Sequence, residues 1–265
     1  MVTLETSANP VRSNEVYAEI FRRYDAKNSS PSGIAERASV LSALGDLTGK
    51  SVLDIGCGTG FYPRVFRRVG ANEVVGIDLS EEMIGVGRQL EELEQAGISY
   101  HVLDAANLPD LGQFDVVTNM WLVNHMTDPV ALAAFIEGFA RLTAPGGTAL
   151  LLTTNRDGDW KLFSDDYRRY GFTMTFNEAE TAGNRPYLLE LDSGGKAFSF
   201  QSTSWSPQVL EEEFTRVGFR TIERMHATLP TGNFPWVDGD HTANDADFFQ
   251  DLLRSPAFTI FRLTK

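Results

Sequence analysis

The chain has 265 residues, of which 42% are hydrophobic and 22% charged, and its formal net charge is −13. This composition is typical of a soluble globular protein, and no run reaches the ~18 uninterrupted apolar residues that cross a membrane. Because proteins that grip phosphate backbones need Lys and Arg, the acidity argues against a nucleic-acid partner. With one cysteine, no intramolecular disulfide and no secretory signal in residues 1–10, we expect a cytoplasmic protein.

The first part of the chain predicts helices. Apolar residues recur at helical spacing over residues 16–24, where they include Tyr17 and Tyr24, and a second such segment covers 34–44. We expect residues 1–48 to form an N-terminal helical lid.

Strand-like and helical segments alternate from residue 51 onward. The strands are expected at 51–55, 73–78, 98–103, 114–119 and 148–153, and the helices at 62–68, 81–95 and 129–142. Such alternation indicates parallel βαβ units, so residues 51–154 predict a Rossmann-like, doubly wound α/β core.

Residues 155–205 do not follow this alternation. A strand is expected at 172–176 and a hairpin at 187–191 and 197–201, turning at 192–195. We interpret the segment as a β-containing substrate cap inserted into one domain that spans 1–265. Residues 206–265 then return to the core with a helix and two strands, 219–225 and 258–263, which we expect to pair with each other, the C-terminal one antiparallel to the sheet.

The sharpest local pattern is Val-Leu-Asp-Ile-Gly-Cys-Gly-Thr-Gly at residues 52–60. An apolar strand carries Asp54 near its end, and alternate glycines then allow the backbone to approach a ligand closely. Asp78 ends the next strand, where a carboxylate can accept hydrogen bonds from two ribose hydroxyls. Together these features predict a nucleoside site.

Two nucleoside cofactors compete for this site. Dinucleotide-binding dehydrogenases space their glycines as Gly-x-Gly-x-x-Gly, with a helix N-terminus facing a pyrophosphate. Here the spacing is Gly-x-Gly-x-Gly, and Asp54 would repel a pyrophosphate but suits the ammonium and sulfonium of S-adenosylmethionine. Charge therefore favours the methyl donor over a nicotinamide cofactor.

The run at 52–60 resembles motif I of class I S-adenosylmethionine-dependent methyltransferases, and later landmarks follow that family's order. Asp78 matches the ribose-binding acid, residues 114–117 resemble the fourth-strand motif, and 145–147 resemble the turn before the fifth strand. The resemblance implies S-adenosylmethionine as cofactor. It also implies a cofactor site of Asp54, Gly56, Cys57, Gly58, Gly60, Asp78, Leu79, Met83, Asp104, Ala105, Ala106, Asn119 and Met120, with Tyr17 and Tyr24 closing over it.

Residues 187–219 are similar to methyltransferases of the toxoflavin-biosynthesis type. This similarity implies methyl transfer to a nitrogen, carbon or oxygen of a small heteroaromatic metabolite in secondary metabolism.

His125 is the first candidate for a catalytic base, because it follows the fourth strand and titrates near neutral pH. The alternative is a histidine that packs beneath the cofactor. Tyr17 and Tyr24 are further catalytic candidates, or simply the apolar face of their helix. The side chains that could form the acceptor pocket, or could equally be ordinary core, are Trp121, His125, Trp160, Phe163, Phe172 and Trp236.

No metal site is expected, because the histidines, including His226 and His241, lack the paired spacing that fixes a metal geometry. The expected partner is a small-molecule substrate, without nucleic acid or membrane, and the protein is expected to be a monomer or homodimer. The alternatives are a protein methyltransferase, and a member of the fold that binds the cofactor as a scaffold or performs a cyclisation.

Overall fold

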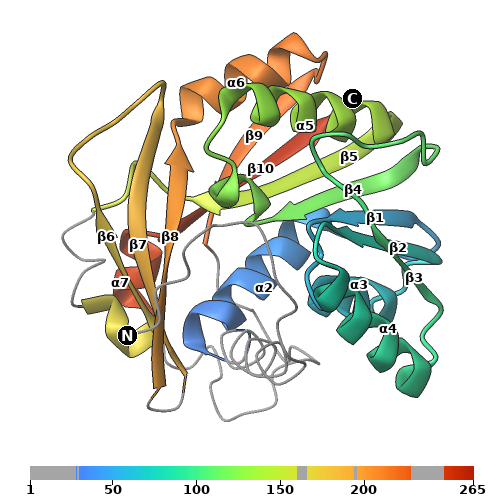
Figure 1. Ribbon diagram of the computed structural model, residues 1–265, viewed down its shortest axis with the longest axis horizontal. Helices are drawn as coiled ribbons and strands as arrows, with labels where there is room; N and C mark the ends of the chain where they lie inside the picture. Colours follow the sequence, from blue (N-terminus) through green and yellow to red (C-terminus); the bar gives the residue numbers. More distant parts are fainter. Residues whose placement is uncertain (1–27, 29, 160–165, 194–195, 228–247) are drawn as a thin grey trace.

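The chain is built around a seven-stranded sheet in the order β3-β2-β1-β4-β5-β10-β9 (Figure 1). The computed structural model describes residues 28, 30–159, 166–193, 196–227 and 248–265. The strands of the central sheet are β1 (Ser51–Ile55), β2 (Glu73–Asp78), β3 (Ile98–Val102), β4 (Phe114–Met120), β5 (Thr143–Thr154), β9 (Thr221–His226) and β10 (Phe258–Thr264).

Strands β1 to β5 run parallel, and β10 is antiparallel to both β5 and β9. The predicted Rossmann-like sheet with an antiparallel C-terminal strand is confirmed, as is the pairing of the last two strands. The strand order reverses between β1 and β4, and ligands bind α/β sheets in the crevice at the carboxyl ends of such strands. The topology therefore places a binding site beyond Ile55 and Met120.

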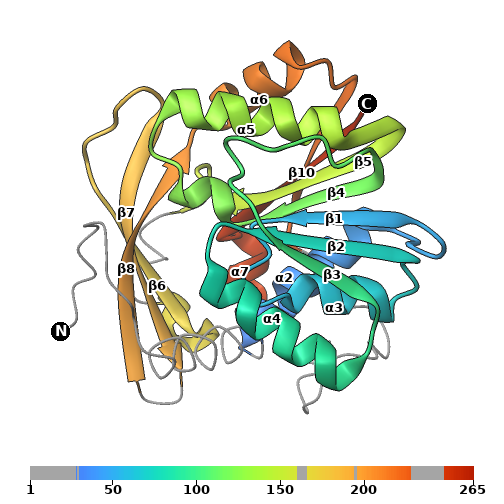
Figure 2. The same ribbon diagram turned by 45° about the vertical axis from the view of Figure 1, so that its right-hand side comes forward.

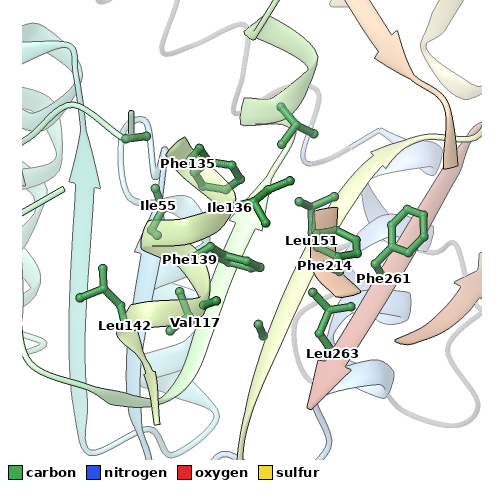
Figure 3. Close-up of a cluster of buried hydrophobic side chains, with 14 of the residues drawn as sticks. Ile55, Val117, Phe135, Ile136, Phe139, Leu142, Leu151, Phe214, Phe261 and Leu263 are labelled. Atoms are coloured by element: carbon green, nitrogen blue, oxygen red, sulfur yellow. The ribbon is translucent and has the colours of Figure 1, made fainter. Parts of the chain in front are cut away.

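Helices cover both faces of the sheet (Figure 1). On one face, α5 (Pro129–Leu142) and α6 (Pro207–Arg216) bury aromatic side chains against the strands. Figure 3 shows Phe135 and Phe139 of α5 on the strand side chains Ile55 and Val117. On the other face lie α2 (Pro31–Leu44), α3 (Phe61–Arg68) and α4 (Glu81–Glu94). Among the helices of the described residues, none is both long and apolar enough to cross a membrane.

Capping side chains set the helix starts. Ser80, Asp128 and Ser206 each accept a hydrogen bond from a backbone N–H of the first turn, which is the usual role of Ser and Asp at this position. Helix α2 begins three residues earlier than expected, because Ser30 caps it and Pro31 occupies its first turn.

A separate three-stranded antiparallel sheet stands at one end of the molecule (Figure 2). It consists of β6 (Phe172–Phe176), β7 (Asn184–Ser193) and β8 (Lys196–Trp205). The two hairpin strands are twice as long as the five-residue runs expected. Their pairing continues past Pro186, a residue that is uncommon within strands, as far as the pair Asn184 and Trp205. A short 3₁₀ helix, η2 (Asp166–Tyr170), and α7 (Gln250–Arg254) accompany this sheet.

Strand β5 also differs from the prediction, because it takes in the expected turn at 145–147. Pairing with β4 shifts register between Phe114↔Thr143 and Val116↔Thr148, so the intervening residues bulge from the ladder. A Cβ at Gly147 would lie 2.9 Å from the carbonyl oxygens of Ala144 and Asp115, so the bulge requires glycine there.

Candidate active site

One cavity of about 400 Å³ connects the carboxyl ends of β1, β2 and β4 with the inner face of the small sheet. A 3₁₀ helix, η1 (Leu122–His125), forms its floor between the two sheets. The lining residues are Asn28, Ser32, Glu36, Asp54, Gly56, Cys57, Gly58, Thr59, Phe61, Tyr62, Asp78, Ser80, Met83, Met120, Trp121, Leu122, Asn124, His125, Phe172, Met174, Tyr187, Leu189, Leu191, Phe200, Ser202, Ala257 and Phe258.

Asp54 is a buried carboxyl group at the base of this cavity. Its Oδ1 accepts a hydrogen bond of 2.7 Å from Thr118 Oγ1, and only 1% of the residue is exposed. The pKa of Asp54 is raised to about 7, mainly by burial, with a smaller contribution from the charge of Asp78 and an opposing one from the hydrogen bond of Thr118. No Lys or Arg of the described residues lines the cavity, so a bound cation would stabilise this carboxylate.

Asp78 is held at the end of β2 by backbone donors. Its Oδ2 accepts from the Gly58 N–H at 2.8 Å, and its Oδ1 accepts from the Ser80 N–H at 2.9 Å. Because each carboxylate oxygen has two lone pairs, both can still accept from a pair of hydroxyl groups. This carboxylate is therefore oriented toward the cavity and able to bind a ribose.

The three glycines of the turn serve different purposes, although all have positive φ angles, Gly56 at 77°, Gly58 at 54° and Gly60 at 80°. A Cβ at Gly56 would lie 2.9 Å from the Cβ of Leu122, whereas one at Gly58 would meet nothing within 4 Å and would enter the cavity. A Cβ at Gly60 would overlap the hydroxyl group of Tyr100. Gly58 therefore leaves room for a ligand, and Gly60 permits core packing.

This difference predicts opposite phenotypes for two matched variants. Both Gly58→Ala and Gly60→Ala incur about 1–2 kcal/mol for left-handed backbone. Gly60→Ala should lose a further ~1–3 kcal/mol of unfolding free energy through overpacking against Tyr100, whereas Gly58→Ala should mainly weaken nucleoside binding. Urea unfolding and calorimetry with S-adenosylhomocysteine measure the two effects. Equal losses of stability and of affinity in both variants would contradict the assignment.

The other proposed cofactor residues are distributed unevenly. Cys57, Met83 and Met120 line the cavity. The remaining positions, Gly60, Leu79, Asp104, Ala105, Ala106 and Asn119, are not part of its lining. Leu79 is 69% exposed, Asp104 lies on the surface, and Asn119 is fully buried, where its amide donates to the Ile55 carbonyl at 2.7 Å.

Trp121 and His125, both expected in the acceptor pocket, line the cavity from either end of η1. Trp121 adopts a φ of 69°, which is a strained value for a non-glycine residue. Residues with such strained backbone angles cluster at functional sites. The His125 ring stacks on Phe200 with centroids 5.8 Å apart and planes at 25°. His125 is an exposed residue, but the groups packed around its ring partly desolvate it and lower the pKa of His125, against a smaller opposing effect of Asp78.

Glu36 on α2 is a cavity residue that the sequence reasoning missed. Its carboxylate, 2% exposed, accepts hydrogen bonds from Tyr62 Oη at 2.8 Å and Trp121 Nε1 at 3.0 Å. The signal available in the sequence was the single acidic residue of the helical segment 34–44. Glu36 thus connects the first described helix to the two aromatic walls of the cavity.

The small sheet contributes the apolar wall of the cavity. Phe172, an expected pocket residue, is joined there by residues that the sequence reasoning did not select: Met174, Tyr187, Leu189, Leu191 and Phe200. Alternate residues of β7 face inward, so the strand period of two accounts for the set. The expected residues Tyr17, Tyr24, Trp160, Phe163 and Trp236, together with His241, lie outside the described residues.

The part of the cavity at the carboxyl ends of β1 and β2, which contains Asp54, Gly58 and Asp78, is called the donor half here. The donor half fits S-adenosylmethionine. The buried Asp54 carboxylate suits the ammonium group of its methionine part, Asp78 suits the ribose, and the open space at Gly58 admits the ligand between them. Within the described ranges, no group of three or more His, Cys, Asp or Glu side chains could hold a metal ion.

Comparisons with known proteins agree with this geometry. Residues 52–147 match the family model described as "Methyltransferase domain". Among curated proteins, the chain is 38% identical over 131 residues to the ubiquinone biosynthesis O-methyltransferase of Pseudomonas aeruginosa, which covers 48% of this chain and 54% of the relative. The corresponding enzyme of Xanthomonas oryzae pv. oryzae is 41% identical over 123 residues, which covers 45% of this chain and 49% of the relative. The chain therefore spans about half the length of these relatives.

Solved structures share the fold over most of the chain. A methyltransferase of Haloferax volcanii, in complex with the activator Trm112, superposes with a TM-score of 0.60 at 19% identity, covering 96% of this chain and 99% of that one. An S-adenosylmethionine-dependent methyltransferase of Mesorhizobium loti gives a TM-score of 0.57 at 18% identity, covering 89% and 100%. The chain shares the fold of these methyltransferases. Residues 52–147, which match the methyltransferase domain model, contain Asp54, Asp78 and the glycine turn of the site.

Proposed function

We propose that this protein transfers a methyl group from S-adenosylmethionine to a small aromatic or heteroaromatic molecule. The observation that carries the proposal is the continuity of one cavity from the acidic ends of β1 and β2 to the apolar face of the small sheet. S-adenosylmethionine supplies an activated methyl group, so the protein must align the acceptor, exclude water and accept a proton.

The acceptor half of the cavity favours a flat apolar molecule. The wall from β6 and β7 is aliphatic and aromatic, and the stacked His125 and Phe200 rings offer a planar surface at its edge. The cavity lies between two sheets, and its volume of about 400 Å³ favours a metabolite over a protein substrate.

His125 is suited to accept the proton that the acceptor releases. Among the described residues, none forms a hydrogen bond with its imidazole, so both ring nitrogens remain available to a ligand. Because desolvation lowers its pKa, the ring is neutral at pH 7 and can act as a base. In the transfer, the bond from the methyl group to the acceptor would form as the bond from the methyl group to the sulfonium sulfur breaks, and the proton of the acceptor's O–H or N–H group would pass to this ring.

The names of the curated relatives favour oxygen as the acceptor atom, because they are ubiquinone biosynthesis O-methyltransferases. A structural neighbour from Micromonospora echinaspora is instead an amino pentose methyltransferase of calicheamicin biosynthesis, with 18% identity and a TM-score of 0.52. We therefore propose oxygen first, and nitrogen or carbon as alternatives. Secondary metabolism, a cytoplasmic location and a monomeric or homodimeric state remain predictions.

The test is turnover of a defined panel of acceptors. Purified protein is incubated with S-adenosylmethionine and catechols, hydroxylated heteroaromatics, aromatic amines or a denatured protein, and S-adenosylhomocysteine is quantified over time. We expect product with the planar small molecules and none with the protein. Binding of S-adenosylhomocysteine without turnover of any acceptor would favour a scaffold or a cyclase-like role instead.

A further inference from the structure

Asn124 on η1 is a buried polar residue where the central sheet meets the small sheet. Its Nδ2 donates to Thr154 Oγ1 on β5 and to the Thr203 carbonyl on β8, each at 2.8 Å. Its Oδ1 accepts from Thr153 Oγ1 at 3.0 Å. Only 2% of the residue is exposed, so one side chain connects both sheets through bonds that water does not replace.

Two cavity-lining residues extend this network toward the acceptor. Ser202 Oγ donates to the backbone carbonyl of Asn124 at 2.9 Å, and Tyr187 Oη lies 2.9 Å from Thr154 Oγ1 and 3.4 Å from Asn124 Nδ2. Hydrogen bonds are directional, so a satisfied polar network fixes one arrangement of the elements it joins. Apolar contact between the same two sheets would allow them to slide.

We infer that Asn124 is a positioning residue, which holds His125 against Phe200 and fixes the small sheet, the apolar wall of the acceptor half, relative to the central sheet. Asn124 immediately precedes His125, and both β8 residues that orient this segment, Phe200 and Ser202, contact one or the other. The inference rests on the proposed function and deepens it, because it identifies what aligns the proton acceptor.

The alternative is a purely structural asparagine, and the ionisation of His125 distinguishes the two roles. The groups around the ring are uncharged on η1 (Leu122, Val123) and on β8 (Phe200), while Asp78 approaches from β2. Desolvation in this position lowers the pKa of the ring. A ring released from its place would lose the neighbours that partly shield it, and its pKa would rise toward 6.5.

The experiment compares Asn124→Ala with a matched control, Asn155→Ala, in the full chain. Asn155 is equally buried, and its Nδ2 donates to the Pro256 carbonyl at 2.7 Å, but it does not line the cavity. The His125 ring is titrated by NMR, with its signal assigned by its absence in His125→Ala. We expect a raised His125 pKa in Asn124→Ala alone, with the S-adenosylhomocysteine dissociation constant within about threefold of wild type in both variants.

A second variant protects the test against a failure to fold. Ser202→Ala removes the hydrogen bond to the backbone carbonyl of Asn124 and leaves the side chain of Asn124 intact. This variant should raise the His125 pKa by a smaller amount than Asn124→Ala. An unchanged His125 titration in folded Asn124→Ala, or in Ser202→Ala if the former does not fold, would overturn the inference, as would a loss of S-adenosylhomocysteine affinity well beyond threefold. If the wild type bound no S-adenosylhomocysteine, the proposed function would fail, while the His125 comparison would still report on Asn124.

Discussion

Replacing Asp54 by Asn should weaken donor binding by at least about 30-fold and at the same time stabilise the ligand-free protein at pH 8. The loss of affinity follows because removing one partner of a buried charge pair costs roughly 2 kcal/mol or more. The gain in stability follows because the free carboxylate has no cation beside it in the described cavity, while an amide still accepts the hydrogen bond from Thr118.

The pH dependence gives this prediction a sign. Asp54 has a pKa of about 7 in the folded protein against an ordinary value of 3.8, so the folded carboxyl holds its proton at pH values where the unfolded one is ionised. Its contribution to stability therefore falls as pH rises from about 4 to 7, by roughly 4 kcal/mol in all. The advantage of Asp54→Asn should accordingly be large at pH 8 and small near pH 4.

Asp115→Asn is the matched control for this measurement. Hydrogen bonds from Ser51 lower the pKa of Asp115, so its ionised form favours the folded state and is lost as the pH falls through that lowered pKa. The control should therefore lower the melting temperature at pH 8, with no change in donor affinity. Melting curves from pH 4 to 8 in which Asp54→Asn never exceeds wild type would contradict the interpretation of Asp54.

Replacing His125 by Ala should lower turnover of the acceptor by about 10²–10⁴-fold, the usual contribution of a positioned general base. Donor affinity should change little, because the ring lies on the acceptor side of the cavity, against Phe200. Wild-type turnover should rise with pH through the lowered pKa of His125, since the base must be neutral, and His125→Ala should lack this rise.

The control for this variant is His226→Ala, because His226 is exposed on β9 and does not line the cavity. Its turnover and pH profile should equal those of the wild type. Turnover that is unchanged in His125→Ala with the true acceptor would eliminate the general-base role and leave a ring that only packs against the acceptor.

The core of the fold was predictable because local signals agreed with one another. Local signals specify each element within a few residues: the apolar strand with Asp54 near its end, the glycine turn after it, and the helix caps Ser80 and Asp128. The alternation of strands and helices followed from them. Asp78 could be placed beside Asp54 because parallel strands bring their carboxyl ends to one edge.

The acceptor half was less predictable because it depends on contacts between segments distant in sequence. The hydrogen bond between Asn124 and Thr203 joins residues 79 positions apart, and the one between Glu36 and Trp121 joins residues 85 positions apart. No periodicity in the sequence predicts either pair. In the sequence, Leu189 and Phe200 look like ordinary strand residues. They line the cavity only because the small sheet faces the carboxyl ends of β1 and β4, where the strand order reverses. Burial and register, unlike helix starts, are properties of the assembled chain.

Calorimetric titration of the wild-type protein with S-adenosylhomocysteine and, separately, NADH at pH 7.5 tests the central claim most directly. The cavity geometry predicts saturable one-to-one binding of S-adenosylhomocysteine, weakened by Asp54→Asn, and no binding of NADH. A folded protein that bound NADH instead, or bound S-adenosylhomocysteine equally well without the Asp54 carboxylate, would contradict the account.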